Sequence, residues 1–251
     1  MIQFNYPDYQ PASGYMTDTI RAQYIESAIE QKLLPHNAHR MEHVISLNAS
    51  NDLAKPVQFW QLYSILGAER IVAIVSRFYA RVYSDENWFK SVFARIASMD
   101  RHINTQSAMW VDVMGGGRYY HGAEFRLNFH HTHNAIELMN DKGAERWVSL
   151  MTQTLNEPDI DYTSDPRVRP AINTFLSYFM GKYAAEFEFE NRSLFGETNP
   201  PLKRRLNLLN MSSDQIEALS EQELIDELAA RKIDVSQYPD KQSLVNKALS
   251  L

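Results

Sequence analysis

The sequence predicts an all-α protein. Apolar residues recur at intervals of three and four along several segments, which is the spacing of one face of a helix. No segment alternates apolar and polar residues convincingly, and no hairpin dipeptide joins two such segments. Three consecutive glycines, Gly115 to Gly117, follow one of the periodic segments, and they predict that its helix ends there.

Composition limits the classes of protein to consider. The 251 residues suffice for one large domain or for one domain with a small appendage. A net charge of −6 gives no electrostatic reason to expect a nucleic acid partner. The absence of cysteine excludes a disulfide framework, a thiolate metal site and a cysteine nucleophile. Because neither a secretory signal nor a long apolar run is visible, we expect a cytoplasmic protein without a membrane segment.

The first 60 residues form an N-terminal extension. An irregular arm leads into an apolar stripe between Ile20 and Leu34, which predicts a helix. Three histidines follow, at positions His36, His39 and His43. We interpret them as ordinary histidines, because no cysteine or cluster of acidic residues completes a metal site nearby.

The central domain, residues 61–195, carries the strongest helical periodicity. Its expected helical segments, in order, are Ile71 to Val82, an apolar cluster from Trp88 to Phe93, Met99 to Val113, and a segment from the cap Asp141 to Leu155. Asp165-Pro166 then signals the entry to a long helix whose apolar stripe extends from Ile172 to Phe187. Within the segment from Met99 to Val113, the side chains of His102, Gln106 and Met109 are spaced so that they project from the same face of the helix. Polar groups beside an apolar stripe are costly unless they meet a partner or a ligand.

A histidine cluster, His130-His131-Thr132-His133, lies beyond the glycine break. Five of the eight histidines fall between His102 and His133. The spacing alone leaves three interpretations open: a haem ligand, a non-haem metal site on His130, His133 and Glu137, or ordinary surface histidines.

The C-terminal part is expected to be a separate small unit. Residues 196–212 contain Lys203-Arg204-Arg205 and are expected to form a linker. In residues 213–251, Ser220 and Glu223 form a capping box, and Asp240 can cap a second helix after a short extended connection. This helix–extended–helix unit resembles SAP and LEM modules. It holds four Lys/Arg and eight Asp/Glu, which favours a protein partner over nucleic acid.

Four stretches together resemble the truncated haemoglobins, in the family's order and near its spacings. They are Ile74 to Val82 with the Phe78-Tyr79 pair, Gly115 to Tyr119, Leu127 to Ile136 with His131, and Trp147 to Met151. The resemblance extends from about Leu66 to Phe187 and is nearest to the subgroup with a distal tryptophan. It implies a truncated-globin-like helical sandwich, here with an N-terminal helical extension and the small C-terminal unit.

The resemblance also implies a haem b cofactor, whose iron takes one strong axial ligand, commonly a neutral imidazole. His131 matches the family's iron ligand in its relation to Leu127 and Ile136. Counting from Gly122 without a gap selects His130 instead, and His133 is the third choice.

The other site residues follow from the same resemblance. Tyr79 and Trp147 match side chains that donate hydrogen bonds to a bound ligand, and Phe93 matches an aromatic residue on the haem face. His102 and Gln106 match the two variable distal positions, with Met109 one turn further on; His102 is also a candidate for direct binding to the iron. Arg118 and Arg126 are candidates to pair with haem propionates.

The function that this resemblance implies is the binding of oxygen or another diatomic gas to haem iron, for redox chemistry or sensing. The sequence departs from the family where Ala123-Glu124 follows Gly122 without a proline, and where a longer loop precedes Trp147. These departures support an alternative: a haem-free globin-like scaffold that acts as a protein-interaction or regulatory module. No pattern decides whether the protein is an enzyme, and no catalytic residue is predicted.

Overall fold

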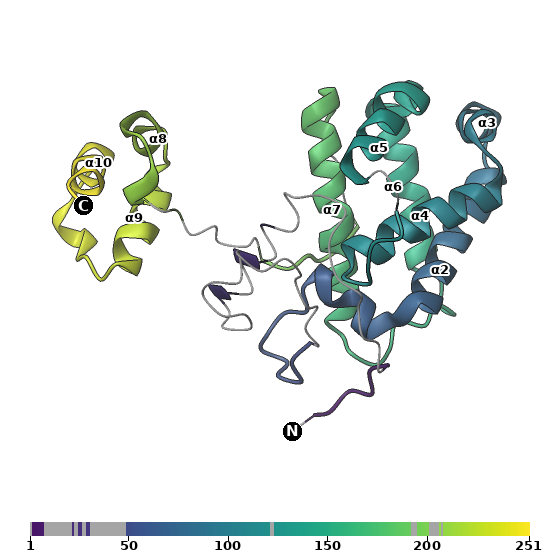
Figure 1. Ribbon diagram of the computed structural model, residues 1–251, viewed down its shortest axis with the longest axis horizontal. Helices are drawn as coiled ribbons and strands as arrows, with labels where there is room; N and C mark the ends of the chain where they lie inside the picture. The colour runs from purple at the N-terminus through teal and green to yellow at the C-terminus, as the bar shows by residue number, and fades with distance from the viewer. Residues whose placement is uncertain are drawn as a thin grey trace. The chain divides into compact units, whose positions relative to one another are not determined.

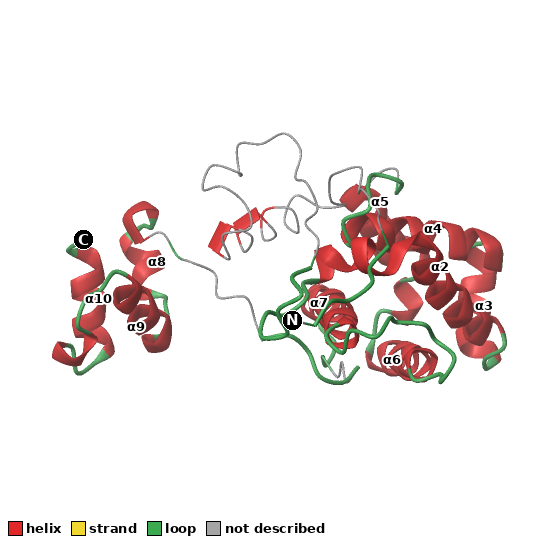
Figure 2. Cartoon of the chain, turned by 90° about the horizontal axis from the view of Figure 1, so that it is seen from below, coloured by secondary structure: helices red, strands yellow, loops and turns green. Residues whose placement is uncertain are grey.

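The computed structural model describes residues 2–7, 22, 25–26, 29–30, 49–120, 123–191, 195–200, 206 and 208–251. The chain divides into two compact units, Met1–Pro201 and Leu202–Leu251. Every regular element within the described ranges is helical, as Figures 1 and 2 show. The prediction of an all-α fold is therefore confirmed.

The first unit is built around α2 (Leu62–Tyr83), which follows the 3₁₀ turn η2 (Phe59–Gln61). A kink at Gly67 interrupts α2, because the φ of 73° at this residue lies in the region that favours glycine. The elements that follow are α3 (Asn87–Ile96), α4 (Met99–Val113), α5 (Ala123–Phe129), the π turn η3 (His130–Asn134), the 3₁₀ turn η4 (Ile136–Leu138), α6 (Asp141–Leu155) and α7 (Val168–Phe187). Helix α2 packs most extensively against α4 and then against α6, and α4 crosses it in Figure 1.

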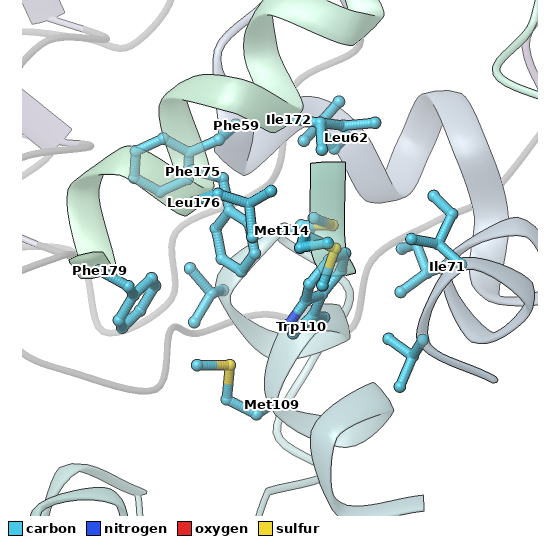
Figure 3. Close-up of a cluster of buried hydrophobic side chains, with 14 of the residues drawn as sticks. Phe59, Leu62, Ile71, Met109, Trp110, Met114, Ile172, Phe175, Leu176 and Phe179 are labelled. Atoms are coloured by element: carbon cyan, nitrogen blue, oxygen red, sulfur yellow. The ribbon is translucent and has the colours of Figure 1, made fainter. Parts of the chain in front are cut away.

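Aromatic side chains from three elements make the centre of the core. Trp110 from α4 lies against Phe175 from α7, with ring centroids 5.0 Å apart and the planes nearly perpendicular (Figure 3). Phe59 of η2 contacts the same Phe175 ring at 6.1 Å. Burial of each such side chain contributes about 1.5–3 kcal/mol to folding, so these contacts fix α4 and η2 against α7.

The N-terminal extension is part of this first unit. Ala22, Ile25, Glu26, Ile29 and Glu30 are helical, and Ile25 is buried in the core. The remaining residues of the predicted helix, from Ile20 to Leu34, lie outside the described residues, as do the three histidines of the extension.

A polar clasp holds residues 2–7 and the segment before η2 to the start of α7. Asp165 and Arg167 are buried and paired, and the Tyr6 hydroxyl donates a hydrogen bond to the Asp165 carboxylate. The Arg167 guanidinium also donates to the carbonyl oxygens of Asp52 and Lys55, each at 2.8 Å. The sequence suggested only a helix start at this position.

The observed ends of the helices agree only in part with the ends predicted from the sequence. Helix α4 ends at Val113 before the glycines, as predicted. The cap of α6 is Asn140 rather than Asp141, because the Asn140 side chain accepts from the Gly143 amide at 3.0 Å while Asp141 is already helical. Met99, placed on the apolar stripe of α4, is 36% exposed because it lies in the first turn of the helix.

The second unit has a core of its own, centred on Leu224 and Leu228 of α9 (Glu221–Ala230) and on Leu244 and Val245 of α10 (Lys241–Leu249). The Ser220–Glu223 capping box and the Asp240 cap are confirmed.

Three short helical elements in the described part of this unit were not expected. They are the 3₁₀ turn η5 (Leu208–Asn210) in the predicted linker, α8 (Ser213–Glu217), and η6 (Val235–Gln237) at the end of the connection predicted to be extended. The basic triplet Lys203-Arg204-Arg205 of the predicted linker lies outside the described residues. No helix in the described part is long and apolar enough to cross a bilayer.

Candidate functional site

A cavity of about 350 Å³ lies inside the first unit. This volume falls in the range of about 300–1,000 Å³ typical of small-molecule and cofactor sites. The main haem-site candidates from the sequence line it: Tyr79, Phe93, His102, Gln106, Met109, His130, His131 and Trp147. Four segments of the chain, α2, α3–α4, η3 and α6, thus bring their candidate residues to one place.

His131 has the environment of a metal-binding imidazole. Its Nδ1 lies 2.8 Å from the carbonyl oxygen of Leu127. Because a carbonyl only accepts, Nδ1 carries the proton, and in a neutral ring Nε2 then carries the lone pair. Burial, with the nearby His130 as a smaller contribution, lowers the pKa of His131 to about 3. The ring is therefore neutral at pH 7, which is the form that binds a metal.

His130 lies next to it with its ring nearly perpendicular, the centroids 5.0 Å apart. Burial lowers the pKa of His130 to about 4, and the charges of His102 and Arg126 act in the same direction. No other described residue hydrogen-bonds to its ring. His130 therefore shares the cavity with His131 but lacks the carbonyl that orients the His131 ring.

His133 does not line the cavity. It is exposed and stacks on Phe129 at 4.2 Å. Glu137, its proposed companion in a non-haem metal site, pairs instead with Arg95 at 2.7 Å. No group of three or more potential ligands that could hold a metal occurs in the described part of the chain, so the non-haem interpretation finds no site there.

Tyr79 and His102 form a stacked pair with ring centroids 5.2 Å apart and planes 15° apart. His102 Nε2 donates to the carbonyl oxygen of Phe93 at 3.1 Å, which engages this nitrogen with the backbone. Burial lowers the pKa of His102 and raises the pKa of Tyr79. His102 thus supports the Tyr79 ring, and its bond to Phe93 argues against direct iron binding through Nε2.

Further donors line the same cavity. The Gln106 amide reaches only the Met109 sulfur, at 3.8 Å. Trp147 packs on Phe78 with ring centroids 4.9 Å apart, and its indole N–H has no partner among the described residues. Phe93 presents its ring to His102, edge to face, at 5.6 Å. Tyr79, Gln106 and Trp147 therefore keep donors that a ligand in the cavity can use.

Arg118 and Arg126 were the two candidates to pair with haem propionates. Arg126 lines the cavity, and its guanidinium lies 4.8 Å from the centre of the Tyr120 ring. Arg118 is exposed and does not line it. Sequence reasoning did not assign Tyr120 or Tyr183 to the site, although both line the cavity. Tyr183 shares the apolar stripe of α7 with Phe175 and Phe179, so its position in the sequence indicated only the core.

These observations fit a haem. The cavity is lined mainly by aromatic and apolar side chains, it contains the His131 imidazole with its Nδ1 held by a carbonyl, and Tyr79, Gln106 and Trp147 add hydrogen-bond donors. A haem requires such a set: one imidazole ligand with its second nitrogen held, and donors near the ligand position.

Comparison with known proteins finds a globin family match in the same part of the chain. Residues 61–178 match the bacterial-like globin family. They include the cavity-lining segments from Tyr79 to Trp147 and most of α7.

Two plant relatives show modest similarity to the chain. Two-on-two hemoglobin-3 of Arabidopsis thaliana is 28% identical over 109 residues, which are 43% of this chain and 61% of that protein. Group 2 truncated hemoglobin 3-1 of Lotus japonicus is 29% identical over 164 residues, which are 64% of this chain and 90% of that protein. The matched part thus covers less than two thirds of the Arabidopsis relative.

Proposed function

We propose that the protein binds haem b in the cavity of the first unit and uses it to bind oxygen or another diatomic gas. The observation that carries this proposal is the environment of His131. Its Nδ1 proton is held by the Leu127 carbonyl, its Nε2 is free of partners among the described residues, and it lines the same cavity as the Tyr79, Gln106 and Trp147 donors.

Haem supplies an iron with a coordination position for a diatomic gas. His131 would hold the iron through Nε2, and the Leu127 carbonyl keeps that nitrogen unprotonated. The Tyr79 hydroxyl stays protonated because burial raises its pKa, so it donates hydrogen bonds at neutral pH. Trp147 lines the cavity, which supports the proposed likeness to the subgroup with a distal tryptophan.

Haem titration of the purified protein tests this proposal. The wild type should give a strong Soret band at one haem per chain. His131→Ala should lose the band, and His130→Ala, a neighbouring histidine in the same cavity, should retain it. Loss in His130→Ala with retention in His131→Ala would move the ligand to His130.

Failure of the wild type to take up haem would reject haem binding. If circular dichroism then shows normal helicity, the haem-free scaffold becomes the better description of the domain.

For the C-terminal unit we propose a protein-docking role. Residues 213–251 carry twice as many acidic as basic side chains, and the unit has its own apolar core. An acidic surface repels phosphate, so the full chain should not bind labelled duplex DNA even at low salt. Measurable, salt-sensitive binding in fluorescence anisotropy would contradict this role.

A further inference from the structure

Tyr183 of α7 lies against the candidate iron ligand. Its ring centroid is 4.1 Å from that of His131, with the planes 34° apart. Tyr183 also lines the cavity, and Phe179, one turn earlier on α7, supports its ring at 6.1 Å. The residue lies beyond positions 61–178, so the family match assigns it no role.

The Tyr183 hydroxyl is one of a few buried side-chain polar atoms that lack a hydrogen-bond partner in the described part of the chain. It is shielded from solvent and has no hydrogen-bond partner among the described residues. Two other tyrosines of the same unit use their hydroxyls: Tyr83 donates to the Ala97 carbonyl at 2.7 Å and Tyr162 to the Leu155 carbonyl at 2.6 Å. A buried hydroxyl without a partner lowers the stability of the fold, and a bound group that accepts its hydrogen bond removes this cost.

Two contacts restrain the His131 ring. The Leu127 carbonyl fixes which ring nitrogen carries the proton, and the Tyr183 ring covers one face of the imidazole. The first contact acts in the plane of the ring and the second acts on its face. Rotation of the imidazole would break its hydrogen bond to the Leu127 carbonyl. It would also make the imidazole clash with the Tyr183 ring or lose contact with it.

We propose that Tyr183 is a positioning residue for the haem site, with separate roles for its ring and its hydroxyl. The ring holds the His131 imidazole in the orientation that leaves Nε2 available to the iron. The hydroxyl donates its hydrogen bond to a carboxylate of the bound haem. This proposal rests on haem binding through His131.

The Tyr183 hydroxyl carries a proton that it can donate, and in the described part of the chain no acceptor takes it. Carboxylates are the haem's own strong acceptors, and a hydrogen bond to a charged acceptor is about twice as strong as one between neutral groups. On this proposal, the Tyr183 hydroxyl has no hydrogen-bond partner before haem binds and donates to a charged carboxylate afterwards.

Two variants separate the two roles. Tyr183→Phe keeps the ring and removes the hydroxyl. We expect it to release haem about tenfold faster to an acceptor apoglobin, which corresponds to about 1.4 kcal/mol. The iron–histidine stretching band in the resonance Raman spectrum of the ferrous protein should stay in place. The haem-free variant should be at least as stable as the wild type in urea, because an unpaired hydroxyl has been removed.

Tyr183→Leu removes the ring as well. We expect the iron–histidine band to shift or broaden, because the imidazole is no longer held on its face. Tyr178→Phe is the matched control, since Tyr178 is on the same helix, packs on Phe59 and does not line the cavity. It should leave both the haem release rate and the Raman band unchanged.

The outcomes distinguish this proposal from haem binding itself. If the wild type takes up no haem, or if His131→Ala keeps it unchanged, both proposals are overturned. If haem binds through His131 and the two Tyr183 variants release it at the wild-type rate with an unshifted Raman band, the role of Tyr183 alone is overturned.

Discussion

The Asp112 carboxylate accepts a hydrogen bond from the backbone amide of Tyr119 at 2.6 Å, and its second oxygen accepts from the amide of Tyr120 at 2.8 Å. Asp112 is 2% exposed and lies in the last turn of α4. The three glycines allow the chain to turn, and Asp112 supplies acceptors for the amides that follow the turn.

Replacement of Asp112 by alanine should therefore destabilise the first unit. Two backbone amides would lose their acceptor, and each unpaired buried group costs about 1–3 kcal/mol. Because Tyr119 is largely exposed and water can reach its amide, we expect a loss of about 2–4 kcal/mol rather than the full sum. Asp112→Asn keeps one acceptor oxygen and should lose less. Urea unfolding followed by circular dichroism measures both, and an alanine variant as stable as the asparagine variant would contradict the role of the carboxylate.

Two glycine substitutions should have opposite effects. A Cβ at Gly116 would lie 2.5 Å from Cδ2 of Tyr63 and 2.6 Å from Cγ1 of Val111, so Gly116→Ala should cost about 1–3 kcal/mol through overpacking. At Gly181, inside α7, the nearest atom is the Asn191 Nδ2 at 3.4 Å. Gly181→Ala should therefore stabilise the protein by up to about 1 kcal/mol through helix propensity. Thermal melts of the two variants give the comparison, and equal shifts would refute it.

The Asp165–Arg167 clasp should contribute far more to stability than an exposed ion pair. In Arg167→Met, the fully buried Asp165 carboxylate and two backbone carbonyls lose their donor, which should cost about 3–5 kcal/mol. Arg95→Met removes the exposed pair with Glu137 and should change stability by less than about 1 kcal/mol. Similar unfolding midpoints for the two variants would show that the clasp is dispensable.

The sequence predicted the helices and the cavity-lining residues better than it predicted the polar contacts. Helix periodicity and the glycine break are local patterns, and they suffice to place Gln106 and Met109 on one face of α4. The partners of Arg167 at Asp52 and Lys55 are 115 and 112 residues away in the chain, so no spacing rule relates them. Asp112 meets Tyr119 only after the glycines have turned the chain.

The choice between His130 and His131 shows a different limit. Counting from Gly122 without a gap assumes that this chain has no residue inserted relative to the family, but the chain changes to a π turn at His130, where the Ala135 amide donates to the His130 carbonyl five residues earlier. A π turn adds a residue to the repeat, so helical counting loses its register at the histidine cluster. The assignment of the iron ligand to His131 stays a prediction.

The pair of Asp85 and Arg146 predicts a specific pH dependence of stability. Asp85 follows α2 and its side chain is almost fully buried, and the Arg146 guanidinium of α6 donates to it from Nε at 2.8 Å and from a second nitrogen. The hydrogen bonds from Arg146 lower the pKa of Asp85 below its ordinary value. The folded state therefore binds the proton more weakly than the unfolded state does.

This difference in proton affinity determines whether stability rises or falls with pH. Because the folded pKa is depressed, the contribution of the pair is fully present above the unfolded pKa of about 4, and it is lost as the pH falls through the folded pKa. Asp85→Asn should cost about 1–2 kcal/mol at pH 7, a value reduced by the partial exposure of Arg146. Near pH 3 the difference from the wild type should shrink. Urea titrations at the two pH values test this, and a difference that grows on acidification would contradict the depressed pKa of Asp85.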